Sequence, residues 1–318
     1  MTHFTFICPS DNSALIESRQ SYVCTVCGRE YPVEDGVIRF LEKNDDFYEG
    51  AYENQVRFSP RSESPWHIWP LWLITNGYPW MVRRHVKEGS TVLELGCAGG
   101  VRYFGNRYRM IGCDLSFSSL RKLDSIYAAR IQADAGTCLP LPDHSVDAVV
   151  SSYFWEHIPP DVKPNILKEF NRILRPGGKL IFLYDVETEN PLISKYKSKD
   201  LTLYNKLFIE GDGHLGYQTP AENIATFIAS GFRIIEHHGI EKTWLQSSSA
   251  YIKLAQFITL DRHLFRWLSR LGEQPFFYFY TALLRIVDTV ICKFLPKNWA
   301  RIDLVVCKAC CKLKEIKK

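Results

Sequence analysis

The stretch Val92-Leu93-Glu94-Leu95-Gly96-Cys97-Ala98-Gly99-Gly100 decides the fold of this chain. Thr91 to Leu95 is an apolar run rich in aliphatic and β-branched residues, which predicts a short buried strand. The small residues after it predict a sharp turn whose backbone approaches a ligand closely. Asp114 ends a second apolar run that starts at Met110. Because ligands of open α/β sheets bind at the carboxyl ends of the strands, this pattern predicts a nucleoside site with a carboxylate on the ribose.

The turn departs from the dinucleotide fingerprint G-x-G-x-x-G, because Ala98 and Val101 occupy its second and third glycine positions. It resembles the E-x-G-x-G-x-G turn of class I S-adenosylmethionine-dependent methyltransferases, with Ala98 for the middle glycine. The resemblance implies S-adenosylmethionine as the cofactor. The spacing from Glu94 to Asp114 is shorter than in that family, which leaves the length of the first helix open. The cofactor-binding residues implied here are Glu94, Gly96, Cys97, Ala98, Gly99, Gly100, Asp114 and Leu115.

Further segments extend the resemblance. Residues 130–135 predict a third strand that ends in an acid, and the resemblance implies that Asp134 and Ala135 contact the adenine, although an aspartate there is also typical of a turn. Residues 148–152 predict a fourth strand, and we assign Ser151 and Ser152 at its end to the cofactor pocket. A helix over 165–174, a Pro-Gly-Gly stop and a strand over 179–184 follow. The similarity covers roughly Val92 to Tyr184 and continues more loosely to Ile235. The sequence therefore predicts an α/β, doubly wound, Rossmann-like sheet of seven strands.

Methyl transfer from a sulfonium requires alignment of the nucleophile and exclusion of water. A general base is needed only where the nucleophile carries a proton at neutral pH. His157 follows the fourth strand, and His214 lies in the loop after the fifth, so both are candidate bases. The alternative for His157 is a structural role at the start of a helix or turn. Tyr153 is a candidate for the wall of the acceptor pocket.

The first 44 residues predict a small, separate β ribbon. Cys8 and the pair Cys24 and Cys27 have the spacing of two facing knuckles, and the segment is similar to the zinc-ribbon-like domains that accompany many methyltransferases. It departs from them at Asp11, which stands where a fourth cysteine belongs. Cys8, Asp11, Cys24 and Cys27 are therefore candidate zinc ligands, since a carboxylate oxygen also binds zinc. The alternative, equally open, is a ribbon without metal that is held by its apolar strands.

The composition is that of a globular protein, with 318 residues, 46% hydrophobic residues and a net charge of +4. That charge is too small to indicate nucleic acid. The chain opens without the pattern of a signal peptide, and its ten cysteines favour a reducing compartment, so we expect a cytoplasmic protein.

Two segments surround the expected methyltransferase domain of residues 89–240. Residues 45–88 are rich in Trp, Tyr and Pro and predict either an apolar cover or a lid over the cofactor. Residues 241–300 predict a helical insertion before a last strand and a basic tail, 301–318. The insertion is expected to cap the core. The alternative is an interfacial surface over residues 251–297, where aromatic residues and the stripe Arg262, Arg266 and Arg270 contact the inner face of a membrane.

The combined pattern favours an S-adenosylmethionine-dependent methyltransferase that acts on a small-molecule or lipid-linked acceptor. The alternatives are an RNA methyltransferase, since a ribbon beside such a domain also resembles certain ribosomal-RNA enzymes, and a catalytically silent partner protein. Nucleic acid is disfavoured because the insertion is aromatic and apolar where an RNA-binding face is rich in Lys and Arg.

Overall fold

The computed structural model describes residues 4–44, 46, 48–49, 77–97, 100–123, 126–270 and 277–310. Most of the aromatic segment 45–88, and with it the predicted cover or lid, lies outside the described residues. Ala98 and Gly99 of the predicted turn, and the basic tail beyond residue 310, also lie outside them.

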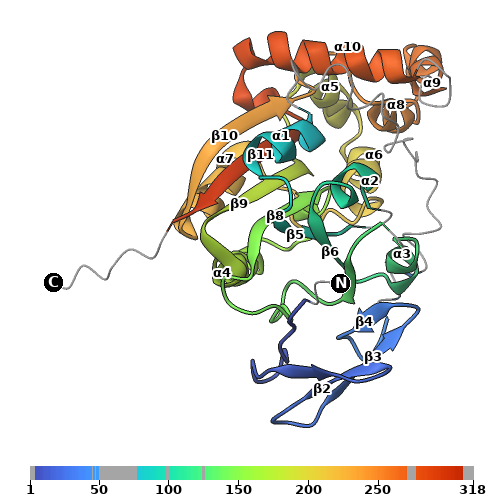
Figure 1. Cartoon of the computed structure of the whole chain (residues 1–318). Helices are drawn as coiled ribbons and strands as arrows, with labels where there is room; N and C mark the ends of the chain where they lie inside the picture. Colours follow the sequence, from blue (N-terminus) through green and yellow to red (C-terminus); the bar gives the residue numbers. More distant parts are fainter. Residues whose placement is uncertain are drawn as a thin grey trace.

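The main sheet confirms the predicted doubly wound α/β fold (Figure 1). The sheet has eleven strands rather than the seven predicted, and its doubly wound part has the order β7-β6-β5-β8-β9-β11-β10, in which β11 runs antiparallel to both of its neighbours. Strands β6 and β7 lie on one side of β5 and the later strands on the other, so the strand order reverses between β5 and β8, which are hydrogen-bonded and parallel. These strands are β5 (Thr91–Leu95), β6 (Arg109–Asp114), β7 (Ala129–Gln132), β8 (Val146–Ser152), β9 (Leu174–Asp185), β10 (Phe232–Ile240) and β11 (Ile302–Ala309).

Helices cover both faces of this sheet because its central strands are apolar on both sides. All five residues of β5 are buried. The core on one face includes residues of α4 (Lys163–Ile173) and α7 (Pro220–Ala229). The core on the other face includes residues of three shorter helices: α1 (Tyr78–His85), α2 (Arg102–Gly105) and α3 (Phe117–Arg121). With four residues, α2 accounts for the short spacing between the glycine turn and β6.

Several predicted boundaries were wrong by a few residues. The third strand ends at Gln132, before Asp134, because the chain turns there. The fifth strand starts at Leu174, so the Pro-Gly-Gly segment expected to precede it is part of β9. Pairing with β8 is irregular at this point, and Gly177 has a φ of +80°, so the extended chain bends without ending.

The N-terminal ribbon is joined to the sheet, which corrects the expectation of a separate unit. Its strands are β1 (Leu15–Glu17), β2 (Ser21–Cys24), β3 (Glu30–Glu34) and β4 (Val37–Arg39). Strand β4 lies parallel to β7, with Ile38 paired to Ile131. Phe6, Cys8 and Tyr31 belong to the same core cluster as Leu93 and Ile131. The ribbon therefore extends the sheet and covers its β7 edge.

The C-terminal insertion forms a helical cap at the end of the molecule opposite the ribbon (Figure 1). It contains α8 (Ser248–Leu254), α9 (Arg262–Arg270), α10 (Phe277–Val290) and the 3₁₀ turns Cys292–Phe294 and Lys297–Trp299. A turn separates α8 from α9. The cap shares a core with α5 (Pro191–Lys199), α6 (Leu201–Asn205) and the π-helical turn Lys206–Glu210. These three elements were not predicted from the sequence.

Candidate functional site

The residues predicted to bind the cofactor follow the carboxyl ends of neighbouring strands. Gly96 follows β5, Asp114 ends β6, Asp134 lies two residues after β7, and Ser151 and Ser152 end β8. These four strands are parallel and adjacent, so their carboxyl ends lie along one edge of the sheet. The topology thus brings the predicted set together.

The turn after β5 has the backbone conformation that its glycines suggested. Gly96 and Gly100 have φ values of +57° and +67°, which non-glycine residues rarely adopt. A Cβ atom at Gly96 would lie 3.1 Å from the Phe154 ring. Cys97, between them, is buried against the core. The turn is therefore closely packed on the protein side, which fixes the path of its backbone.

Glu94 lies beneath the turn rather than on its ligand side. Its side chain is 2% exposed, and the phenol of Tyr127 donates a hydrogen bond to its carboxylate. The same phenol oxygen accepts the backbone N–H of Val101 at 2.8 Å. Burial raises the pKa of Glu94 to about 8. Tyr127 lies in the turn before β7, where no sequence pattern marked it as part of the site.

Asp114 is half-buried, and its Oδ1 accepts the backbone N–H of Ser116 at 2.9 Å. The carbonyl oxygen of Leu115 accepts a hydrogen bond from the Gln132 side-chain amide at 2.9 Å. Asp134 accepts the backbone N–H of Gly136 at 2.7 Å, which is the turn geometry named as the alternative for this residue. Ala135, beside it, is buried.

Ser151 and Ser152 differ in their surroundings. Ser151 is 1% exposed and donates its hydroxyl to the Leu95 carbonyl at 3.0 Å, so it ties β8 to the end of β5. Ser152 is half-buried at the strand end.

The chemistry of this edge fits the adenosine part of S-adenosylmethionine. A half-buried carboxylate suits the ribose hydroxyls, and the left-handed Gly96 lets backbone approach a ligand without a Cβ in the way. Glu94 fits less well as a direct contact, because its carboxylate is buried and bonded to Tyr127.

The two candidate histidines come together although they lie far apart in the sequence. The rings of His157 and His214 are 5.3 Å apart and nearly perpendicular, and both side chains are buried. Nδ1 of His157 is 3.0 Å from the Gly213 carbonyl, whereas Nδ1 of His214 has no hydrogen-bond partner among the described residues. Burial and the neighbouring His214 lower the pKa of His157 to about 4, and burial lowers that of His214.

Glu156 completes this cluster, although no sequence motif had marked it as a site residue. One ligand atom from each of Glu156, His157 and His214 lies within 4.8 Å of the others. Glu156 is 1% exposed, its Oε2 is without a partner among the described residues, and burial raises its pKa well above the usual value. The one sequence feature that could have identified Glu156 as a site residue is its position directly before a candidate histidine.

Tyr153 is the candidate that remains accessible. It is 45% exposed and has a φ of +57°, an unfavourable backbone conformation for an aromatic residue. Its backbone N–H donates to the Leu183 carbonyl at 2.8 Å, which holds that conformation against β9. Strained residues of this kind cluster at functional sites.

The ribbon gathers the four candidate metal ligands. One ligand atom of each of Cys8, Asp11, Cys24 and Cys27 lies within 4.8 Å of the others. The Sγ atoms of Cys8 and Cys27 are 3.7 Å apart, and Sγ of Cys24 is 3.4 Å from Oδ2 of Asp11. Three thiols and one carboxylate are a donor set that zinc accepts.

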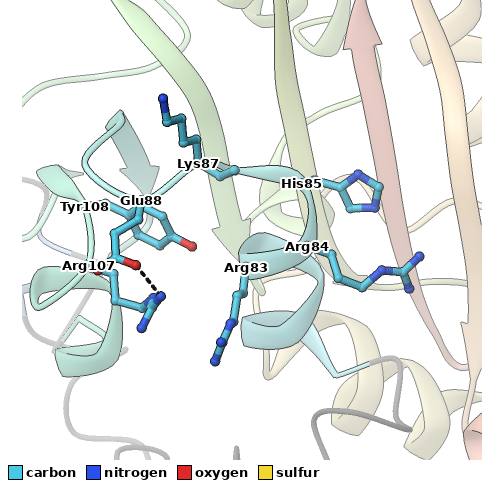
Figure 2. Close-up of a pocket in the computed structure, with 8 residues that line it drawn as sticks. Arg83, Arg84, His85, Lys87, Glu88, Arg107 and Tyr108 are labelled. Carbon is cyan, nitrogen blue, oxygen red and sulfur yellow. Dashed lines mark hydrogen bonds and ion pairs between the residues drawn. The ribbon is translucent and has the colours of Figure 1, made fainter.

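A basic hollow of about 430 Å³ lies at the amino ends of the strands, opposite the candidate site (Figure 2). It is formed by the end of α1, the segment before β5 and the segment before β6. Arg84 lies 2.8 Å from Glu236, and Arg107 lies 2.5 Å from Glu88. Because these ion pairs offset its charge and it lies at the amino ends of the strands, this hollow is separate from the candidate site.

Residues 93–182 match the family model of a methyltransferase domain, so the chain contains a domain of this family. A curated relative, the ubiquinone/menaquinone biosynthesis C-methyltransferase of Hahella chejuensis, is 32% identical over 126 residues, which are 35% of this chain and 49% of that protein. The demethylmenaquinone methyltransferase of Bacillus cereus is 26% identical over 164 residues, 45% of this chain and 65% of that protein.

The chain spans about half the length of the first of these relatives. Among solved structures, a SAM-dependent methyltransferase of Methanosarcina mazei aligns with 73% of this chain and 98% of its own, at 14% identity and a TM-score of 0.46.

Proposed function

We propose that this protein is an S-adenosylmethionine-dependent methyltransferase with a small-molecule or lipid-linked acceptor. The observation that carries the proposal is the match of residues 93–182 to a methyltransferase domain, at the edge of the sheet where Gly96 and Asp114 lie. When bound, S-adenosylmethionine supplies a methyl group that is already activated. The protein has to bind the nucleoside, orient the acceptor and exclude water.

The named residues divide this work. Asp114 binds the ribose hydroxyls, and the turn from Gly96 to Gly100 follows the remainder of the cofactor. Tyr153 orients the acceptor, because it is the exposed candidate at the end of β8. His157 and His214 are buried and neutral at neutral pH, which suits them to forming hydrogen bonds behind this edge more than to removing protons from it.

Calorimetric titration with S-adenosylhomocysteine tests the cofactor assignment. The wild type should bind it, and Asp114→Ala should bind at least about tenfold more weakly, since a charged hydrogen bond contributes about 1.5–3 kcal/mol. Asp143→Ala is a matched control, because Asp143 lies in the loop at the amino end of β8. Absence of binding by the wild type, or equal affinity of the Asp114→Ala variant, would contradict the assignment.

The acceptor class is supported by the relatives, whose names describe methyltransferases of ubiquinone and menaquinone synthesis. Lysate treated with the enzyme and radiolabelled S-adenosylmethionine should be separated into RNA, organic and aqueous fractions. We expect label in the organic or aqueous small-molecule fraction, and less of it with Tyr153→Ala. Label found mainly in RNA would favour a nucleic-acid acceptor instead.

We also propose that Cys8, Asp11, Cys24 and Cys27 hold a structural zinc ion. The support is the convergence of three thiols and one carboxylate in the ribbon. Metal analysis of the purified protein should give close to one equivalent of zinc, and Cys24→Ser should lose most of it. Cys138→Ser is the control, since Cys138 is a thiol outside the cluster. A zinc content far below one equivalent in the wild type would remove the site.

A further inference from the structure

The helical cap exposes an unusual number of large apolar side chains. Of the sixteen exposed large apolar side chains among the described residues, nine lie between residues 258 and 294. Elsewhere such residues occur singly, which is normal for a protein surface. The nine are Ile258, Leu260, Leu264, Trp267, Leu283, Ile286, Val290, Ile291 and Phe294, and we call them the apolar cap residues.

These side chains are exposed because other residues of the same helices form the core of the cap. In α9, Phe265 and Leu268 are buried in the cap core, which leaves Leu264 and Trp267 facing solvent. In α10, Leu284 and Val287 are buried. The remaining Leu283, Ile286 and Val290 follow one another at three- and four-residue spacing and form an exposed stripe along that helix.

The turn before α9 is the most exposed part of this surface. Ile258 is 92% exposed and Leu260 is 99% exposed, although Phe257 beside them is buried. Two fully exposed aliphatic side chains in one turn contribute nothing to the core, so their contribution to the free energy of unfolding is small.

Basic side chains are interleaved with the apolar cap residues. His263, Arg266 and Arg270 are exposed on α9, and Lys293 and Lys297 are exposed after α10. Of the described acidic residues in this part of the cap, Asp261 is paired with Lys195 at 3.0 Å and Asp288 is buried. Apolar and aromatic groups with interspersed cations are typical of surfaces that lie in a membrane interface.

A hollow of about 400 Å³ lies between α8 and α9, next to these residues. Arg262 and Arg266 line it together with Gln256 and Ser269. Nε of Arg262 is buried and has no hydrogen-bond partner among the described residues. Two guanidinium groups, one with an unused donor, match the geometry of a phosphate group.

We propose that the helical cap docks on a bilayer that contains anionic lipid. The apolar cap residues enter the interface, and Arg262 and Arg266 bind a lipid phosphate in the hollow between α8 and α9. The proposed contact is peripheral. Within the described residues, no helix is long and apolar enough to cross a membrane. Docking does not depend on methyl transfer and is tested without it.

The test is co-sedimentation of the purified full chain with vesicles of phosphatidylcholine that contain increasing phosphatidylglycerol, at low and high salt. Binding should rise with the anionic fraction and weaken with salt. Arg262→Ser/Arg266→Ser should lower the affinity about 25-fold, because each cation near an anionic surface contributes about 1 kcal/mol, a fivefold change. Glycerol phosphate in solution should not displace the protein, since it offers the phosphate without the apolar interface.

Ile258→Ser/Leu260→Ser should weaken binding at least about tenfold at every lipid composition, with unchanged thermal stability. The matched controls are Arg19→Ser/Lys168→Ser and Ile16→Ser, which change exposed cations and an exposed apolar residue outside the cap. Equal losses in the control variants would attribute binding to net charge and overturn the proposal.

Failure of the wild type to bind anionic vesicles at low salt would also overturn it. In that case a dimer in solution that Ile258→Ser/Leu260→Ser dissociates would assign the surface to a second copy of the chain. The measured mass of the wild type and of this variant distinguishes the two occupants.

Discussion

The phenol of Tyr127 donates a hydrogen bond to the buried carboxyl group of Glu94 and, through the same oxygen, accepts the backbone N–H of Val101. The acid at the end of β5 is thereby connected to the chain that leaves the glycine turn. A residue after α3 thus sets the shape of a turn that precedes α2. We expect the affinity of the cofactor site to depend on this link although neither side chain needs to contact the ligand.

Tyr127→Phe should test the link directly. Loss of the hydroxyl leaves the buried Glu94 carboxyl and the Val101 N–H without their partner, which costs about 1–3 kcal/mol in the free energy of unfolding. Affinity for S-adenosylhomocysteine should fall as well. Tyr108→Phe is the control, since the Tyr108 hydroxyl is buried without a partner among the described residues and its loss should cost little. Equal stability of the two variants, measured by denaturant unfolding, would contradict the role of Tyr127.

Glu94→Gln should change how stability depends on pH. The carboxyl ionises near pH 4.5 when unfolded and with a pKa of about 8 when folded, so between these values the folded state binds more protons. This residue therefore lowers the stability of the wild type as pH rises through that window, by about 1.4 kcal/mol per pH unit at most. Glutamine stays neutral, so the variant should gain stability relative to the wild type on going from pH 5 to pH 8.

The measurement is urea unfolding of both proteins across that range. Glu88→Gln, on the exposed segment before β5, controls for the change in net charge. A constant difference in stability between Glu94→Gln and the wild type at all pH values would show that Glu94 is not held neutral by its burial.

His157→Gln should affect stability on the acid side. The imidazole has an ordinary pKa of 6.5 when unfolded and a pKa lowered to about 4 in the folded protein by burial and by His214. Between these values the unfolded state binds more protons, so the wild type loses stability as pH falls, by at most about 3 kcal/mol from this group. Glutamine can still donate to the Gly213 carbonyl and does not titrate. The variant should show a shallower loss below pH 6.5 in denaturant unfolding, and an unchanged slope would contradict the prediction.

Arg301→Met should lower the stability of the protein where the helical cap meets the sheet. Arg301 is 4% exposed and lies 2.5 Å from the buried Glu241 carboxylate, with Ser247 and Asp185 also in contact at 2.8 and 3.3 Å. Removal of one partner of a buried ion pair costs about 3–5 kcal/mol, because it leaves the other charge uncompensated.

The double variant Arg301→Met/Glu241→Gln should recover part of that loss, since it removes the stranded charge. Thermal unfolding of the single and double variants measures the recovery. If the double variant recovers no stability, Arg301 stabilises the fold through hydrogen bonds to uncharged groups rather than through its ion pair with Glu241.

The sequence by itself determined the central sheet and the positions along it of the residues that we predict to bind the cofactor. Residues 91–95 and 109–114 are continuous apolar runs that end at a glycine or an acid, and such local patterns report strand identity and strand ends directly. The order of the motifs established the resemblance to methyltransferases. The resemblance then implied which part of the cofactor the residues at each strand end contact.

Only the tertiary structure decided which groups face a ligand and which face the core. Glu94 and Asp114 are alike in sequence, yet one is buried under Tyr127 and the other is half-buried at the sheet edge. His157 and His214 meet because the turn after the π-helical segment Lys206–Glu210 is hydrogen-bonded to the segment after β8, where the Gly216 N–H donates to the Glu156 carbonyl. The ribbon joins the sheet because the edge of β7 was open to pairing. Such contacts depend on residues tens of positions apart, so no local pattern encodes them. The exposed residues of the cap were likewise indistinguishable from core residues until the packing of α8, α9 and α10 was known.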